Sequence, residues 1–165
     1  MTRPLAVLLA LGVAACGGAR SPAPPAPQTL NEALSQFLDA VKAKDFTRMG
    51  NLWGDERGPA SSFMKPDDLQ RRLWTIQVYL DHTGYRVIEG PLQAQPFNPT
   101  FRNVPSPEKL REFRIELQRE PCNRVVPITL VRPKSGGWLV YDVRLESVGN
   151  PRSGCQPPAP GGTRP

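Results

Sequence analysis

The strongest candidates for general acids or bases lie at two places along the chain. Asp81 and His82 are neighbours, and Asp142 follows Tyr141. Carboxylate and imidazole groups transfer protons when a fold brings them into one cavity. Asp81, His82 and Asp142 are therefore the catalytic candidates. Because adjacent residues of a strand face opposite sides of the sheet, Tyr141 and Asp142 are expected to point in opposite directions.

Each of these candidates also has a structural role, which the local pattern favours. His82 lies near the expected end of a helix, where an imidazole interacts with the helix dipole or lies at the surface. Asp142 and Arg144 share the polar face of an expected strand and would form an ion pair worth well under about 1 kcal/mol.

Aromatic side chains offer a different kind of candidate, a surface on which a ligand could stack. The ligand-binding candidates are Trp53, Trp74 and Tyr79. Because both tryptophans lie at periodic apolar positions, packing in the core is their preferred role. One histidine and three widely spaced cysteines are too few for a zinc cluster. The sequence therefore predicts neither a metal site nor a cofactor.

The N-terminal segment carries a targeting signal. Arg3 precedes an apolar run over residues 5–15, which is typical of a secretory signal peptide and is shorter than the roughly twenty residues that cross a bilayer. The run ends in Val13-Ala14-Ala15-Cys16, which resembles the lipobox of bacterial lipoproteins with valine in place of leucine. The resemblance implies cleavage before Cys16, a diacylglyceryl thioether on its sulfur, and acylation of the new amino group by a fatty acid such as palmitate. In the alternative, an ordinary signal peptide is removed and Cys16 is a free or paired thiol.

The lipoprotein interpretation also organises the chain. Residues 1–15 are the signal peptide, 16–29 the lipidated cysteine with a Pro/Ala-rich linker, 30–148 the folded domain, and 149–165 a Gly/Pro-rich tail. The protein is then exported and held to a membrane by its N-terminal lipid. Gly17 follows the cysteine and lacks the aspartate that favours retention in the inner membrane, so the resemblance favours the outer membrane, facing the periplasm.

The chain is basic, with 21 lysines and arginines against 15 aspartates and glutamates and a formal net charge of +6. This balance suits anionic lipid headgroups or acidic glycans, although a solvated surface is the simpler explanation. An exported protein has little access to nucleic acid, so we expect no nucleic-acid partner.

Cysteine usage follows from the same interpretation. With Cys16 acylated, as the resemblance implies, Cys122 and Cys155 remain as a pair in an oxidising compartment, where disulfides persist. A bridge between them would tie the C-terminal tail to the folded domain.

Helical periodicity dominates the first half of the domain. Apolar residues at steps of four, three and four predict a helix over residues 30–43. Asp45 stands at the N-cap of a short second helix, and the polar segment 54–60 is expected to be a loop. A third helix is expected to begin at Pro66 and to stop before Gly84.

The second half changes to a period of two, which predicts strands. A short strand is expected over 85–89, and alternation over 113–118 and 126–130 predicts two more. Pro127 indicates an edge position or a bulge for the latter. A Gly-rich turn then leads into a last strand over 138–145, so that two long antiparallel strands form a hairpin. The proline-rich segment between these groups fits either an extra strand over 92–95 with a loop, or one long loop.

Helices followed by strands predict a single α+β domain whose N-terminal helices pack on a curved antiparallel sheet. The pairs Phe37-Leu38-Asp39-Ala40-Val41 with Lys44-Asp45-Phe46, and Gly137-Trp138-Leu139-Val140 at the start of the last strand, resemble the nuclear transport factor two-like superfamily, which includes ketosteroid isomerase and scytalone dehydratase. The resemblance covers residues 30–148. It implies a cone-shaped, cystatin-like fold with a pocket at the open end.

Function is less specified than fold, because members of that superfamily use the pocket as an active site, as a ligand site or not at all. Ketosteroid isomerase-like chemistry needs a carboxylate base beside a tyrosine, and no spacing here matches that set. Scytalone dehydratase-like chemistry uses paired histidines, and this chain has one. We therefore expect a non-catalytic module that binds a small apolar ligand, or an envelope protein through the sheet face and the 54–60 loop. The alternative is an isomerase or dehydratase with Asp81, Glu89 or Asp142 in the pocket.

Overall fold

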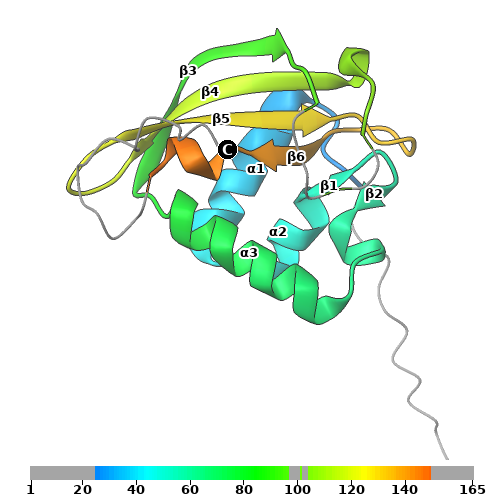
Figure 1. The fold of residues 1–165 in the computed structure, drawn as a ribbon, viewed down its shortest axis with the longest axis horizontal. Coiled ribbons are helices and arrows are strands. Elements are labelled where there is room, and N and C mark those ends of the chain that lie inside the picture. The colour runs from blue at the N-terminus through cyan, green and yellow to red at the C-terminus, as the bar shows by residue number, and fades with distance from the viewer. Residues whose placement is uncertain (1–24, 97–100, 102–103, 150–165) are drawn as a thin grey trace, which may run out of the picture.

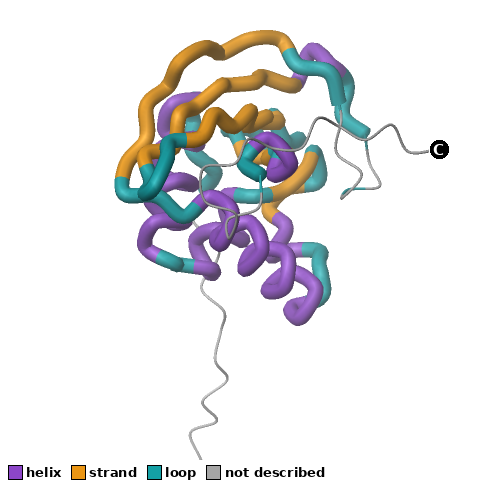
Figure 2. The backbone as a smooth tube through the Cα atoms, turned by 60° about the vertical axis from the view of Figure 1, so that its left-hand side comes forward, coloured by secondary structure: helices purple, strands orange, loops and turns teal. Residues whose placement is uncertain are grey.

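The computed structural model describes residues 25–96, 101 and 104–149 (Figure 1). Three helices and a small hairpin precede a four-stranded antiparallel sheet. Figure 2 shows most of the helical residues gathered on one side of the sheet, with the strands curving over them. The prediction of an α+β domain is confirmed.

The helices begin where the sequence places them. They are α1 (Leu30–Ala43), α2 (Phe46–Leu52) and α3 (Pro66–Leu80). Thr29 caps α1 in a reciprocal capping box with Glu32, and the Asp45 carboxylate caps α2 by accepting a hydrogen bond from the Arg48 backbone N–H at 2.9 Å. Pro66 starts α3, where a missing N–H costs no helical hydrogen bond. Local capping chemistry therefore explains the three starts.

The segment predicted as a loop contains regular structure. β1 (Gly54–Asp55) and β2 (Gly58–Pro59) are strands of two residues each that pair as an antiparallel hairpin. A short 3₁₀ helix, η1 (Ala60–Ser62), follows. Trp53, just before the hairpin, forms an isolated parallel bridge with Val140 of the last strand. The hairpin thus lies beside the main sheet, a tertiary contact that local polarity cannot reveal.

The main sheet has the strand order β3-β4-β5-β6. Its strands are β3 (Gly84–Gln93), β4 (Leu110–Gln118), β5 (Arg124–Val131) and β6 (Leu139–Val143), and two further 3₁₀ turns are η2 (Pro107–Lys109) and η3 (Leu145–Ser147). The first strand is twice as long as expected, because it continues through two register shifts, one between Val87 and Glu89 and one between Glu89 and Leu92. Gly90, at φ 121°, permits this path, which breaks the alternation that marks a strand.

Pro127 lies in an interior strand, so the prediction of an edge position is wrong. β5 pairs with β4 on one side and β6 on the other. Pro127 comes immediately before the last β5–β6 pair, Ile128 with Val143, and its carbonyl accepts a hydrogen bond from the Arg144 N–H at 3.2 Å. The missing proline N–H therefore falls where β6 ends. A register shift does occur nearby, between Thr129 and Leu130.

The core joins the helices to one face of the sheet, and the end of the linker packs onto it. Pro27 is buried, and its carbonyl accepts a hydrogen bond from the Trp138 N–H at 2.8 Å. Gly137, at φ 75°, lets the chain pass, since a Cβ there would lie 2.8 Å from both the Pro27 oxygen and the Ala26 Cβ. The last residues of the predicted linker are thus attached to the start of β6.

Candidate functional site

Asp81 and His82 line a surface cavity of about 270 Å³ where α3 gives way to β3. Only 7% of His82 is exposed, and its Nδ1 lies 2.7 Å from the Leu80 carbonyl oxygen. A carbonyl only accepts, so Nδ1 carries a proton and donates it in this contact. Within the described part of the chain, Nε2 makes no hydrogen bond. His82 therefore combines the helix-end contact expected of a structural residue with a second nitrogen that is unengaged.

The same cavity contains a cation from the end of β4. Arg119 donates from Nη1 to the Tyr79 carbonyl at 2.8 Å. Burial lowers the pKa of Arg119, the neighbouring Arg124 lowers it further, and Asp81 opposes both effects. The Asp81 carboxylate is exposed and accepts a hydrogen bond from the Gln77 amide at 3.2 Å.

Asp142 lies elsewhere, on β6 opposite Thr129. Burial raises the pKa of its carboxyl to about 6, and Glu146 and Glu112 add to the shift while the Val143 N–H and Arg144 oppose it. The expected ion pair with Arg144 does not form among the described residues. Instead, the Arg144 guanidinium bonds Glu112 on β4. The structure thus brings Asp81 and His82 together and leaves Asp142 apart from them.

Glu89, the remaining acid of the enzyme alternative, is exposed on β3. Its carboxylate pairs with Arg114 of β4 at 3.2 Å. A carboxylate engaged by a neighbouring cation at the surface is a poor match for the apolar cavity that a carboxylate base requires.

Aromatic rings meet beside β1 and β6. Trp53 is 2% exposed, and its ring centroid lies 4.9 Å from that of Phe101. Phe101 also stacks on Tyr141 at 5.5 Å and meets the edge of Phe63 at 6.2 Å. Burial, with Asp142, Asp55 and Glu56 nearby, raises the pKa of Tyr141 to about 12. The preferred core role of Trp53 is confirmed.

Trp74 behaves differently from Trp53, and the prediction that it packs in the core is wrong. It is 58% exposed on α3 and borders a shallow groove with Arg71. The buried stripe of α3 runs through Leu73, Ile76 and Leu80, and the residue after Leu73 projects about 100° away from that stripe. The third aromatic candidate, Tyr79, is partly buried against the core.

Asp55 is a buried charged residue that sequence reasoning missed. Its side chain is fully buried and accepts hydrogen bonds from the Arg57 backbone N–H at 2.8 Å and from Arg57 Nη2 at 2.7 Å. The Arg57 guanidinium carbon lies 3.8 Å from the Phe63 ring centroid, and the hydrogen bond to Asp55 raises the Arg57 pKa. The Asp-x-Arg spacing is the signal present, but spacing alone does not report burial.

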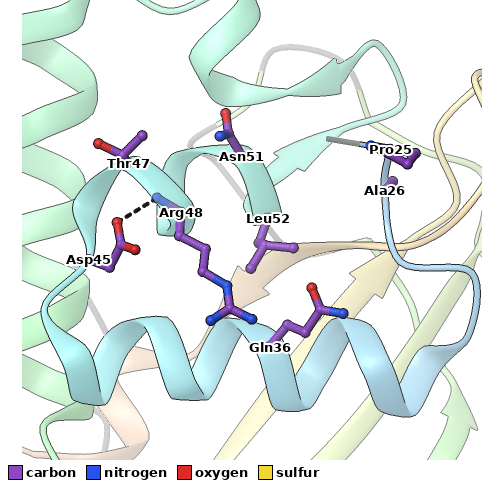
Figure 3. Close-up of a pocket in the computed structure, with 8 residues that line it drawn as sticks. All are labelled: Pro25, Ala26, Gln36, Asp45, Thr47, Arg48, Asn51 and Leu52. Carbon is purple, nitrogen blue, oxygen red and sulfur yellow. Dashed lines mark hydrogen bonds between the residues drawn. The ribbon is translucent and has the colours of Figure 1, made fainter. Parts of the chain in front are cut away.

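A third cavity, of about 320 Å³, lies between α1, α2 and the end of the linker (Figure 3). Arg48 extends from α2 toward Gln36 of α1. Asn51 also lines the cavity, but its side chain points to the opposite side of α2 (Figure 3). No sequence motif singled out these residues as a site. They come together because α1 and α2 pack against each other and Pro25 and Ala26 close one side.

Several expectations concern residues that the structure does not describe. Cys16 and Cys155 both lie outside the described residues, so lipidation and the Cys122–Cys155 pairing stay predictions. Cys122 itself is disulfide-bonded.

Residues 25–96, 101 and 104–149 contain neither a metal-binding cluster nor a membrane-spanning helix. Across those residues, no cluster of three histidine, cysteine, aspartate or glutamate side chains could hold a metal ion. No helix there has both the length and the hydropathy of a membrane span.

Comparison with protein-family models, curated proteins and solved structures finds no match.

Proposed function

We propose that this chain is an exported lipoprotein, anchored through Cys16, whose domain serves as a binding module in the cell envelope. The lipobox-like Val13-Ala14-Ala15-Cys16 and the apolar run before it support the anchor. We further propose the cone-shaped fold of the nuclear transport factor two-like superfamily. Its support is the order of elements, in which three helices and a short hairpin precede four antiparallel strands that curve over the helices (Figures 1 and 2).

The observation that carries the binding role is the cavity at the end of the linker. Its volume of about 320 Å³ falls in the usual range for small-molecule sites, roughly 300–1,000 Å³. The Arg48 guanidinium and the Gln36 amide lie toward each other in it (Figure 3). Such groups bind and orient a ligand.

The anchor is tested by replacing its sulfur. Expressed in a bacterium that processes lipoproteins, the wild-type chain should incorporate labelled palmitate and sediment with membranes, whereas Cys16→Ser should do neither. Cys155→Ser is the matched control, because it removes a different cysteine and should leave both properties intact. Membrane retention of Cys16→Ser would refute the lipid anchor, and density-gradient separation of the two membranes tests the outer-membrane placement.

A second function has one observation in its favour. A carboxyl with a pKa of about 6, as at Asp142, is poised to exchange protons near neutral pH. Asp142 is therefore the acid with which to test the isomerase or dehydratase alternative. The test is deuterium exchange at carbons next to a carbonyl, followed by NMR over a panel of ketones. Exchange that is catalysed by the wild-type chain and lost in Asp142→Asn would support an enzyme, and equal exchange by both would exclude Asp142 as its base.

A further inference from the structure

We propose that the cavity between α1, α2 and the linker binds a small monocarboxylate, with Arg48 as its anchor. The inference deepens the binding function proposed above and rests on it. It depends on the state of Arg48, on the groups around it, and on the charge balance of the cavity.

Arg48 is an exposed residue whose guanidinium has no anionic partner among the described residues. No hydrogen bond or ion pair to its side chain occurs in the described part of the chain, and only its backbone N–H is engaged, by Asp45. By contrast, Arg86 and Arg114 each pair with a glutamate across β3 and β4. The Arg48 fork instead points along the cavity toward α1 (Figure 3). Two parallel N–H donors match the two oxygens of a carboxylate.

The remaining walls suit a compact body with hydrogen-bonding groups. The Asn51 amide oxygen accepts a hydrogen bond from the Ser61 hydroxyl at 2.7 Å, so this side chain points toward η1 and away from Arg48 (Figure 3). Gln36 faces the cavity from α1 with no hydrogen bond to any described residue. Leu52, 6% exposed, adds an apolar surface. A carboxylate joined to an amide or hydroxyl fits this combination.

Charge distinguishes a carboxylate from a phosphate. Asp45 also borders the cavity, and its carboxylate is engaged by the Arg48 backbone N–H, which carries no net charge. The cavity therefore contains one cation and one anion. A monoanion leaves it with a single negative charge, whereas a phosphate dianion would leave two close together and be disfavoured by repulsion.

The wall formed by the linker is held in place before any ligand arrives. Pro27, next to the cavity residue Ala26, is buried and bonded to the Trp138 N–H. The Gln28 side chain also donates to the Ala26 carbonyl at 2.7 Å. The linker wall therefore needs little ordering when a ligand binds.

The test uses the mature chain in detergent micelles, isotopically labelled for NMR. It is titrated with N-acetylalanine, which carries one carboxylate and one amide, with N-acetylalaninamide, the same body without the charge, and with inorganic phosphate. N-acetylalanine should shift the backbone signals of Ala26, Gln36 and Asn51. The uncharged analogue should bind at least about tenfold more weakly, because it has no carboxylate to accept charge-assisted hydrogen bonds from Arg48. Phosphate should also bind at least about tenfold more weakly, because its second negative charge is repelled by Asp45.

Two substitutions make the result specific to Arg48. Arg48→Gln keeps the backbone N–H that Asp45 accepts from, so it should fold with an unchanged melting temperature and bind N-acetylalanine at least about tenfold more weakly. Arg72→Gln removes an exposed charge of α3 and should bind as wild type. The site is refuted if N-acetylalanine gives no shifts at millimolar concentration, if the uncharged analogue or phosphate binds as tightly, or if Arg48→Gln binds as wild type. Membrane release of the wild-type chain with binding intact would refute the anchor alone, so the two failures are distinguishable.

Discussion

Replacing Asp55 and replacing Arg57 should lower the stability of the domain by different amounts, although the two residues form one ion pair. Asp55 has a fully buried side chain, whereas the Arg57 side chain is 44% exposed. Replacing Arg57 with alanine leaves a buried carboxylate that keeps one bond, from the backbone N–H of residue 57 at 2.8 Å. Replacing Asp55 with alanine leaves a guanidinium that water can reach. The free-energy cost should therefore fall mainly on Arg57→Ala.

The magnitudes follow from burial. An unpaired buried charge costs about 3–5 kcal/mol, so Arg57→Ala should lower the free energy of unfolding by at least about 3 kcal/mol. Asp55→Ala removes hydrogen bonds but leaves no unpaired buried charge, so it should lower the free energy of unfolding by about 1–2 kcal/mol. In the double variant no buried carboxylate remains, so the cost should return to nearly that of Asp55→Ala. The coupling energy between the two changes then equals nearly the whole cost of Arg57→Ala, at least about 3 kcal/mol.

Urea unfolding of the four proteins, followed by circular dichroism, measures this coupling. The exposed i,i+3 pair of Asp68 and Arg71 on α3 is the matched control, and its coupling should stay below about 1 kcal/mol. The reasoning is refuted if Asp55→Ala costs more than Arg57→Ala, or if the two costs simply add.

Three further predictions concern other parts of the chain. The Asp142 carboxyl has a folded-state pKa of about 6 against an ordinary 3.8, so its ionisation costs stability as the pH rises through that window. Asp142→Asn should therefore match wild type below about pH 4 and exceed it above about pH 6, by at most about 3 kcal/mol, and a difference that does not vary with pH in urea titrations would contradict the shift. Trp53→Ala should lower stability by about 3–5 kcal/mol and Trp74→Ala by less than about 1 kcal/mol, and similar urea midpoints for the two variants would show that their burial does not differ. Reduction of the Cys122 disulfide should cost about 3–4 kcal/mol, and this dependence on reductant should vanish in Cys155→Ser if those two cysteines pair.

Local chemistry was enough to predict most of the helices and strands. Capping residues and apolar spacing act within a few positions of each other, so α1 and the starts of α2 and α3 can be read from Asp45, Pro66 and their neighbours. The length of β3 was underestimated because its sequence lacks such a local pattern. Its exposed edge carries few buried residues, and the shifts around Gly90 remove the period of two. The interior position of Pro127 could not be predicted, because it depends on where β6 ends along β5.

The candidate sites were less predictable because they depend on which surfaces meet. Asp81 and His82 are adjacent in sequence, so their common cavity was accessible to inference, but Arg119 joins them from a different strand. Arg48 and Gln36 come from separate helices, and neither lies in a recognisable motif. The prediction for Trp74 was wrong because this residue lies one position after Leu73, and that step turns its side chain away from the buried stripe of α3.

The position of the cavities bears on how far the superfamily resemblance extends. The resemblance implies a ligand pocket at the open end of the domain. Beside β6, the aromatic rings of Trp53, Phe101 and Tyr141 pack closely against one another. The cavity with the clearest binding chemistry lies instead against the linker, where Arg48 has no partner among the described residues. The proposed fold does not require its site at that end, because a fold does not fix where a site lies. Binding by Arg48 is therefore the measurement on which the proposed function depends most.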